Sequence, residues 1–172
     1  MKVSKEPLVS AAALRKRIAE LAAEISRDYV DQEMVLIAVL KGAMPFAADL
    51  MRALAVDPVL DFVRAKSYEG TASTGDIRFT LLPETPLAGK QILLVEDILD
   101  TGQTAAAILE RLRAQAPASL RLCTLLDKPV RREIAVAADY AGFVIDDHFV
   151  VGYGLDYEER YRALDSVFIL ET

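Results

Sequence analysis

A short acidic stretch is the part of this sequence best suited to chemistry. Four apolar residues run directly into Glu96 and Asp97, and a third carboxylate, Asp100, follows three positions later. Residues 101–104, which are Thr, Gly, Gln and Thr, then lead into a helix-favouring run. Carboxylates accept hydrogen bonds from sugar hydroxyls, and free N–H groups at a helix start bind phosphate. The stretch therefore predicts a site for a sugar phosphate.

The same turn also fits an ordinary helix start. Asp100 or Thr101 would then cap a helix over 103–115, and Gly102 would supply a positive φ or room for a ligand. For Thr101 alone this interpretation is adequate. It leaves unexplained why two adjacent carboxylates stand at the end of a buried strand, where an unpaired charge is costly.

Alternating strands and helices must position these residues. Apolar residues at spacings of three and four predict a helix over 11–29, capped by Ser10, and a second helix is expected over 44–54. Strands are expected over 34–40, 58–64, 77–82, 91–96, 120–126, 143–145, 148–153 and 166–170. The continuously apolar central strands indicate a parallel sheet with helices on both faces. Ligands of such sheets bind at the carboxyl ends of the strands, where Lys41 and Lys128 also fall.

Length and composition exclude several classes of protein. The chain has 172 residues, 53% of them hydrophobic and 27% charged, which predicts one globular domain over 1–172. No apolar run approaches the ~20 residues of a membrane span. A formal net charge of -6 argues against nucleic-acid binding, and the short basic clusters at 14–17 and 131–132 favour solvated surface. A single cysteine and the lack of a secretory signal favour the cytoplasm.

The acidic stretch resembles the phosphoribosyl-pyrophosphate signature of the type I phosphoribosyltransferases. With Leu99 before Asp100 and Thr-Gly after it, the stretch is similar to the 6-oxopurine branch, the hypoxanthine (guanine) phosphoribosyltransferases. The similarity extends from about residue 34 to 170 and rests on several separate motifs. It implies an α/β fold with a mostly parallel central sheet flanked by helices. The core would span about 30–145, and a small hood would come from the N-terminal segment and about 146–172.

The resemblance also implies roles for the acidic residues. Glu96 and Asp97 would hold the ribose hydroxyls, directly or through Mg²⁺, the expected cofactor. Asp100 would be the catalytic base near purine N7, and Asp156 would join Glu96 and Asp97 as a metal contact. The 5′-phosphate would lie in the loop formed by Asp100, Thr101, Gly102, Gln103 and Thr104.

A Leu-Lys-Gly turn follows the strand expected at 34–40. From spacing alone, Lys41 would be a solvated lysine at a strand end. The resemblance instead implies a pyrophosphate site at Lys41 and Gly42, with an unusual cis peptide bond between Leu40 and Lys41. Arg162 would complete this site, because a guanidinium can bind phosphate oxygens in a bidentate manner. Arg160 is close by and is the less favoured choice.

A second lysine and an aromatic residue would recognise the base. Lys128 would donate to the purine 6-oxo group and so reject adenine, whose 6-amino group is itself a donor. Phe149 would stack on the purine, the backbone of Val150 would meet the ring edge, and Asp156 would line the same site. A surface position for Lys128 and a core position for Phe149 are the alternatives.

Residues 66–76 are small and polar and predict a mobile loop. Within it, Ser67 and Tyr68 resemble the Ser-Tyr pair of the catalytic loop of the family, which closes over the reacting centre. Water exclusion is the physical reason, because cleavage at the ribose C1′ passes through a cation-like sugar. An ordinary surface loop is the alternative.

These expectations combine into one predicted reaction. A Mg²⁺-dependent enzyme of purine salvage would transfer the phosphoribosyl group from phosphoribosyl pyrophosphate to hypoxanthine, and to guanine as well, and release pyrophosphate. The partners would be these small molecules, without nucleic acid or membrane, in a homodimer or homotetramer. A xanthine- or guanine-preferring sister enzyme and a non-catalytic nucleotide-sensing regulator of the same fold are the alternatives. Asp100, Lys128 and the Ser67-Tyr68 pair favour the enzyme.

Overall fold

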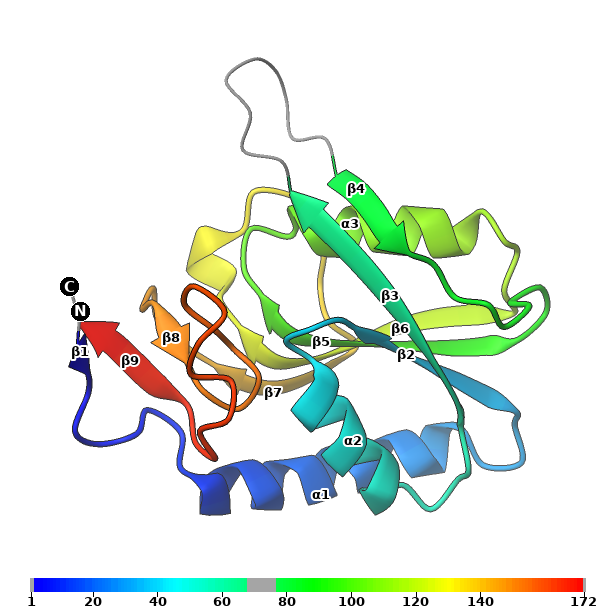
Figure 1. The fold of residues 1–172 in the computed structure, drawn as a ribbon. Helices are drawn as coiled ribbons and strands as arrows, with labels where there is room; N and C mark the ends of the chain where they lie inside the picture. The colour runs from blue at the N-terminus through cyan, green and yellow to red at the C-terminus, as the bar shows by residue number, and fades with distance from the viewer. Residues whose placement is uncertain (1, 68–76, 172) are drawn as a thin grey trace.

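A six-stranded sheet forms the centre of the protein, whose computed structural model describes residues 2–67 and 77–171 (Figure 1). The strand order is β4-β3-β2-β5-β6-β7. The strands are β2 (Met34–Val39), β3 (Val59–Ser67), β4 (Ile77–Leu81), β5 (Gln91–Leu99), β6 (Ser119–Asp127) and β7 (Tyr140–Val144). All neighbours are parallel except β3 and β4, which are antiparallel. The predicted α/β fold with a mostly parallel sheet is confirmed.

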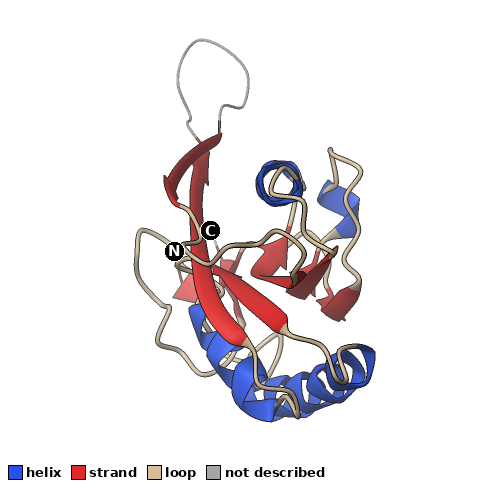
Figure 2. Cartoon of the chain, turned by 90° about the vertical axis from the view of Figure 1, so that its right-hand side faces the viewer, coloured by secondary structure: helices blue, strands red, loops and turns tan. Residues whose placement is uncertain are grey.

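Helices cover both faces of this sheet (Figure 2). The helices α1 (Ala11–Asp28) and α2 (Met44–Ala53) pack on one face, and α3 (Gln103–Arg113) packs on the other. Side chains alternate along β5 as the pleat requires, so Leu93 and Val95 face α1 and α2 while Ile92 and Leu94 face α3. This alternation continues into the acidic residues that follow.

Local sequence explains where α1 begins and how it is held. The Ser10 hydroxyl accepts a hydrogen bond from the Ala13 N–H at 3.2 Å, as expected of an N-cap. From the middle of the helix, Arg17 donates to the carbonyl oxygens of Ala141 and Gly142 in β7. These two hydrogen bonds attach α1 to β7. No helix among the described residues is long and apolar enough to cross a membrane.

Segments from both ends of the chain form a second, small antiparallel sheet (Figure 1). Its order is β1-β9-β8, with β1 (Lys2–Val3), β8 (Val150–Val151) and β9 (Phe168–Glu171). The strand expected over 148–153 is shortened to two residues because the chain turns with positive φ at Gly152, Tyr153 and Gly154. Two-residue β1 is too short to show a periodic pattern, and it was not predicted. We call this sheet with residues 146–167 the hood.

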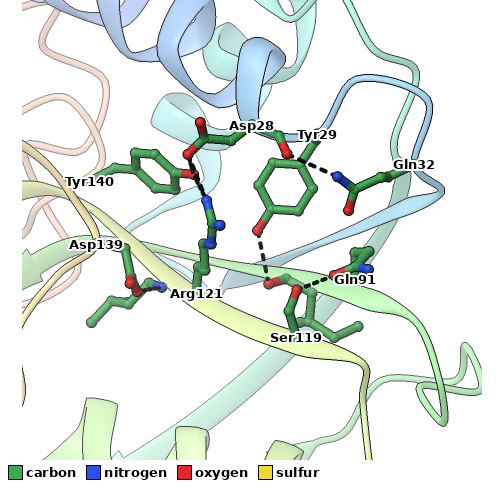
Figure 3. A network of polar contacts seen from close by, with 10 residues as sticks. Asp28, Tyr29, Gln32, Gln91, Ser119, Arg121, Asp139 and Tyr140 are labelled. Carbon is green, nitrogen blue, oxygen red and sulfur yellow. Dashed lines mark hydrogen bonds and ion pairs between the residues drawn. The ribbon is translucent and has the colours of Figure 1, made fainter.

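A polar network joins α1 to the amino ends of the central strands (Figure 3). The Asp28 carboxylate accepts hydrogen bonds from the Arg121 guanidinium and the Tyr140 hydroxyl, each at 2.6 Å. The guanidinium of Arg121 also lies over the Tyr29 ring, 5.5 Å from its centroid. The network lies where β6 and β7 begin, at the opposite end of these strands from their carboxyl termini.

Candidate active site

An open strand edge creates the site. β2 ends at Val39, and its last pair with β5 joins Ala38 to Val95. β5 continues to Leu99 because β6 still pairs with it on the other side. The strand therefore runs three residues beyond its predicted end at residue 96. From Glu96 onward, its edge toward β2 is free, and the turn after β2 lies beside it.

Glu96 and Asp97 point to opposite faces of the sheet. Glu96 follows Ile92 and Leu94 toward α3, and only 6% of the residue is exposed. Asp97 points the other way, against Gly42. The two carboxylates are adjacent in sequence, but they do not face a single ligand group together.

Burial perturbs both acids. Burial, reinforced by the charge of Asp97, raises the pKa of Glu96 to about 8, although the Arg132 guanidinium opposes this. Burial likewise raises the pKa of Asp97 to about 6, against hydrogen bonds from backbone N–H groups. Oε2 of Glu96 has no hydrogen-bond partner among the described residues. A buried acceptor without a donor is costly, so this atom is suited to a ligand hydroxyl.

Two glycines let three segments touch. A Cβ at Gly42 would lie 1.7 Å from Oδ2 of Asp97, and a Cβ at Gly154 would lie 2.0 Å from the carbonyl oxygen of Gly42. Only residues without side chains allow this stack of β5, the 40–42 turn and the hood turn. The peptide bond between Leu40 and Lys41 is cis, as the resemblance implied. The hydroxyl of Tyr153 donates to an Asp49 carboxylate oxygen and so attaches the hood turn to α2.

The hood places Arg162 beside Lys41. One Arg162 nitrogen donates to the Gly154 carbonyl oxygen at 2.7 Å, and another lies 2.8 Å from Asp156 Oδ1. The carboxylate of Glu159 joins this group, 3.0 Å from Arg162 and 2.9 Å from Lys41 Nζ. Two cations far apart in sequence are thus brought together, as predicted. The contribution of Glu159 was not predicted, because it depends on contacts across space.

The predicted phosphate loop opens α3. Gly102 is the N-cap, with φ +88°, and it has no side chain to cap the helix. Of the two caps expected from the sequence, the Thr101 hydroxyl accepts a hydrogen bond from the Gln103 N–H at 3.4 Å, whereas Asp100 makes no such bond among the described residues. A pocket of about 200 Å³ lies between the end of β5 and the start of α3. It is lined by Glu96, Asp97, Ile98, Leu99, Asp100, Thr101, Gly102, Thr104 and Ala105. The side chain of Gln103 instead donates to Glu133 at 2.7 Å.

A segment after Lys128 supports this loop. The Thr101 carbonyl oxygen accepts from the N–H groups of Glu133 and Ile134 at 2.9 and 3.0 Å. A Cβ at Gly102 would lie 2.9 Å from the Ile134 carbonyl oxygen, so this close approach requires glycine. The adjacent 3-10 turn η1 (Pro129–Arg131) precedes these residues.

The sequence-based assignment of residues 131–132 to solvated surface is confirmed for Arg131, which is exposed, and wrong for Arg132. Nε of Arg131 lies 3.4 Å from Asp100 Oδ1, an atom that is buried and has no hydrogen-bond partner in the described residues. The side chain of Arg132 is only 15% exposed and contacts Asp127. A pair of arginines after a strand carries no periodic signal, so the inward direction of Arg132 could not be foreseen.

Of the residues expected to recognise a base, Lys128 lies next to the phosphate loop and Phe149 lies in the hood. Lys128 is 5% exposed, its N–H donates to the Leu99 carbonyl oxygen at 3.0 Å, and its Nζ lies 3.7 Å from Asp147. Phe149 is 54% exposed and meets the Tyr157 ring edge-on, with centroids 5.8 Å apart. A surface position for Lys128 and a core position for Phe149 are therefore both wrong.

Val150 and the Ser-Tyr pair complete the predicted set. Val150 is buried in β8 and pairs with β9. Ser67 is the last residue of β3. Tyr68 lies outside the described residues.

The acidic residues fit a partial magnesium site. The charge of Asp156 raises the pKa of Asp97, so the two carboxylates lie near each other where the hood meets β5. Within the described ranges, no three His, Cys, Asp or Glu side chains gather into a metal-binding group. Mg²⁺ commonly takes one or two carboxylates and fills its other positions with water and phosphate oxygens. The arrangement fits that mode of binding.

Comparison with known proteins places this geometry in context. Residues 6–158 match the phosphoribosyl transferase domain family. The chain is 44% identical to hypoxanthine phosphoribosyltransferase of Escherichia coli (strain K12) over 170 residues, 97% of this chain and 96% of that protein. It is 41% identical to hypoxanthine-guanine phosphoribosyltransferase of Bacillus subtilis (strain 168), over 95% of this chain and 92% of that protein. A crystal structure of a Bacillus anthracis hypoxanthine-guanine phosphoribosyltransferase superimposes with a TM-score of 0.94 at 40% identity, covering 99% of this chain and 100% of that one.

Proposed function

The chain belongs to the phosphoribosyl transferase family, and from this premise we propose how its residues divide the work. Hypoxanthine(-guanine) phosphoribosyltransferase activity in purine salvage is the function that its relatives and its site support. The enzyme transfers the 5-phosphoribosyl group from phosphoribosyl pyrophosphate to hypoxanthine, and to guanine as well. The products are IMP or GMP and pyrophosphate.

One hydrogen bond carries this assignment. The N–H of Lys128 donates to the carbonyl oxygen of Leu99, the residue before Asp100. The lysine that would recognise the 6-oxo group is thus joined directly to the loop that would hold the 5′-phosphate. A purine at Lys128 and a ribose phosphate at residues 101–104 would meet beside Asp100.

Asp100 is the proposed base for the purine proton. Its Oδ1 is buried without a hydrogen-bond partner among the described residues, so an acceptor is available there. The Arg131 guanidinium lies 3.4 Å from the same oxygen. Phe149 would stack on the purine with its exposed ring, and the backbone of Val150 would meet the ring edge.

The sugar and pyrophosphate would occupy the rest of the cleft. Glu96 would accept from a ribose hydroxyl through its unpartnered oxygen, and N–H groups at the start of α3 would bind the 5′-phosphate. Lys41 and Arg162 would bind the pyrophosphate. Mg²⁺ would be held by Asp97 and Asp156, with Glu96 reaching the sugar side, and would neutralise charge on the substrate.

Two further assignments complete the proposal. Ser67 and Tyr68 would belong to a loop that excludes water from the cation-like sugar. A cytoplasmic homodimer or homotetramer is the expected form, and light scattering after gel filtration would measure its mass.

A direct assay tests the function. The protein is incubated with phosphoribosyl pyrophosphate, Mg²⁺ and one of five bases, and nucleotides are measured by chromatography. Hypoxanthine and guanine should react, whereas adenine should not, because Lys128 offers a donor and the adenine 6-amino group is also a donor. Uracil should not react, because it lacks the purine ring. Reaction with xanthine in preference would indicate the sister enzyme. Nucleotide binding without any turnover would indicate the regulator.

Asp100→Ala tests the proposed base. General-base catalysis contributes on the order of 10²–10⁴ to rate, so turnover should fall at least about 100-fold. The KM for phosphoribosyl pyrophosphate should change much less. An unchanged turnover number would remove Asp100 from this role.

A further inference from the structure

The two cations assigned to pyrophosphate already hold an anion that belongs to the protein. One oxygen of Glu159 lies 2.9 Å from Lys41 Nζ and 3.0 Å from an Arg162 nitrogen. This carboxylate therefore joins the turn after β2 to the hood at the point where the pyrophosphate would bind. Neither strand pairing nor core packing requires this contact.

Local structure holds the carboxylate and the cations in place. The N–H of Glu159 donates to Asp156 Oδ2 at 2.9 Å, and its backbone is left-handed with φ +62°. Arg162 is fixed from the other side by Gly154 and Asp156. The hydrogen bonds with Lys41 and Arg162 lower the pKa of Glu159 to about 2, so it is ionised at neutral pH.

We propose that Glu159 is an internal competitor of pyrophosphate. Its carboxylate must leave Lys41 and Arg162 before a pyrophosphate group can bind them, and it returns when the product departs. The side chain is 58% exposed, so it can turn into solvent without breaking the core. The inference rests on the proposed function, because that function assigns Lys41 and Arg162 to pyrophosphate.

The competition has a defined energetic consequence. A cation that pairs with Glu159 gains less from a phosphate oxygen, since the first ion pair must be broken. Phosphoribosyl pyrophosphate and free pyrophosphate lose affinity by a similar factor, because both need the same two cations. Hypoxanthine binding is unaffected, because Lys128 and Phe149 make no polar contact with Glu159 among the described residues.

Glu159→Gln tests the proposal, because it removes the charge and preserves the size of the side chain. Titration calorimetry measures the Kd of inorganic pyrophosphate, and steady-state kinetics with Mg²⁺ measures the KM for phosphoribosyl pyrophosphate. Both should fall about fivefold, the size expected when two partly exposed ion pairs no longer have to be broken. The difference should shrink as KCl is raised, because salt screens exposed charges. The KM for hypoxanthine should stay the same.

Glu158→Gln is the matched control. It makes the same change in net charge one position earlier, and Glu158 has no side-chain hydrogen bond or ion pair among the described residues. Its constants should stay within about twofold of the wild type. An equal effect of both variants would show a general charge effect and overturn the proposal. Weaker pyrophosphate binding by Glu159→Gln would also overturn the proposal, because it would show that Glu159 positions the cations. Unchanged pyrophosphate binding would overturn it as well.

The same experiments separate this inference from the function on which it rests. A wild-type protein that forms no IMP would refute the transferase activity. If Glu159→Gln still bound pyrophosphate more tightly than wild type and Glu158→Gln, the competition would stand without that activity. Active wild-type enzyme with unchanged constants in Glu159→Gln would refute only the competition.

Discussion

Replacing Glu96 by glutamine should stabilise the protein above neutral pH. Glu96 is 6% exposed, and one of its oxygens has no hydrogen-bond partner among the described residues. Burial raises its pKa to about 8 from an ordinary value of 4.5. When the group ionises in the folded protein, it loses solvation that the unfolded chain would provide.

The sign and size follow from proton linkage. Between pH 4.5 and 8 the folded state binds more protons at Glu96 than the unfolded state, so stability falls as the pH rises. At about 1.36 kcal/mol per pH unit, Glu96 should cost about 1 kcal/mol at pH 5 and about 4 kcal/mol at pH 8. Glutamine does not titrate, so the advantage of the variant should grow by roughly 3 kcal/mol over this range. In a chain of this length that is on the order of 10 °C in Tm.

Urea denaturation and calorimetry from pH 5 to pH 8 would measure this effect. Glu110→Gln is the matched control, because Glu110 is exposed on α3 and has no ion pair within the described part of the chain. Its stability should run parallel to that of the wild type. Parallel curves for Glu96→Gln as well would refute the reasoning, since Glu96 would then be ionised in the folded state throughout. The stabilised variant should bind phosphoribosyl pyrophosphate less tightly, because a carboxylate acceptor for the ribose is lost.

Three further changes test other parts of the structure. Gly42→Ala would bring a Cβ to 1.7 Å from an Asp97 oxygen, so kcat/KM for phosphoribosyl pyrophosphate should fall at least about tenfold in steady-state assays. An unchanged value would show that the turn moves freely. Lys128→Met should raise the KM for hypoxanthine and guanine by about 10- to 100-fold, and an equal rise for phosphoribosyl pyrophosphate would contradict base recognition. Asp28→Ala removes the acceptor of Arg121 and should cost about 1–3 kcal/mol in urea unfolding. Its kcat should be unchanged, and a lower kcat in folded protein would show that the network of Figure 3 affects the site.

Much of the fold was predictable because the spacing of apolar residues along the sequence indicates which side of a helix or strand is buried. The helix predicted over 11–29 is observed at Ala11–Asp28, and Ser10 caps it as expected. The strand predicted over 91–96 continues to Leu99. The charged residues suggested an earlier end, but pairing with β6 extends the strand. Strand length at that point is a property of the neighbouring strand, and local sequence does not contain it.

The candidate site was predictable only where a motif lies at a strand end. Parallel topology brings Lys41 and Lys128 to one edge of the sheet, and the structure places them there. The contacts of Glu159, Arg131 and Arg132 depend on how the hood and η1 fold back, so sequence spacing could not indicate them. Glu96 and Asp97 point in opposite directions because side chains alternate along a strand. The rule applies to Asp97 because β5 continues beyond its predicted end at residue 96.

The pairing of the hood has a consequence for synthesis on the ribosome. β9 is the middle strand, and Lys2 and Val3 pair with Glu171 and Leu170. Lys2 and Val3 are therefore synthesised long before the residues with which they pair. β8 waits for the same strand, so Phe149 and Arg162 acquire their framework only when β9 has emerged. A nascent chain with a finished central sheet would hold residues 101–104 in place but not yet Phe149, so the two halves of the proposed site would come together only after β9 has been synthesised.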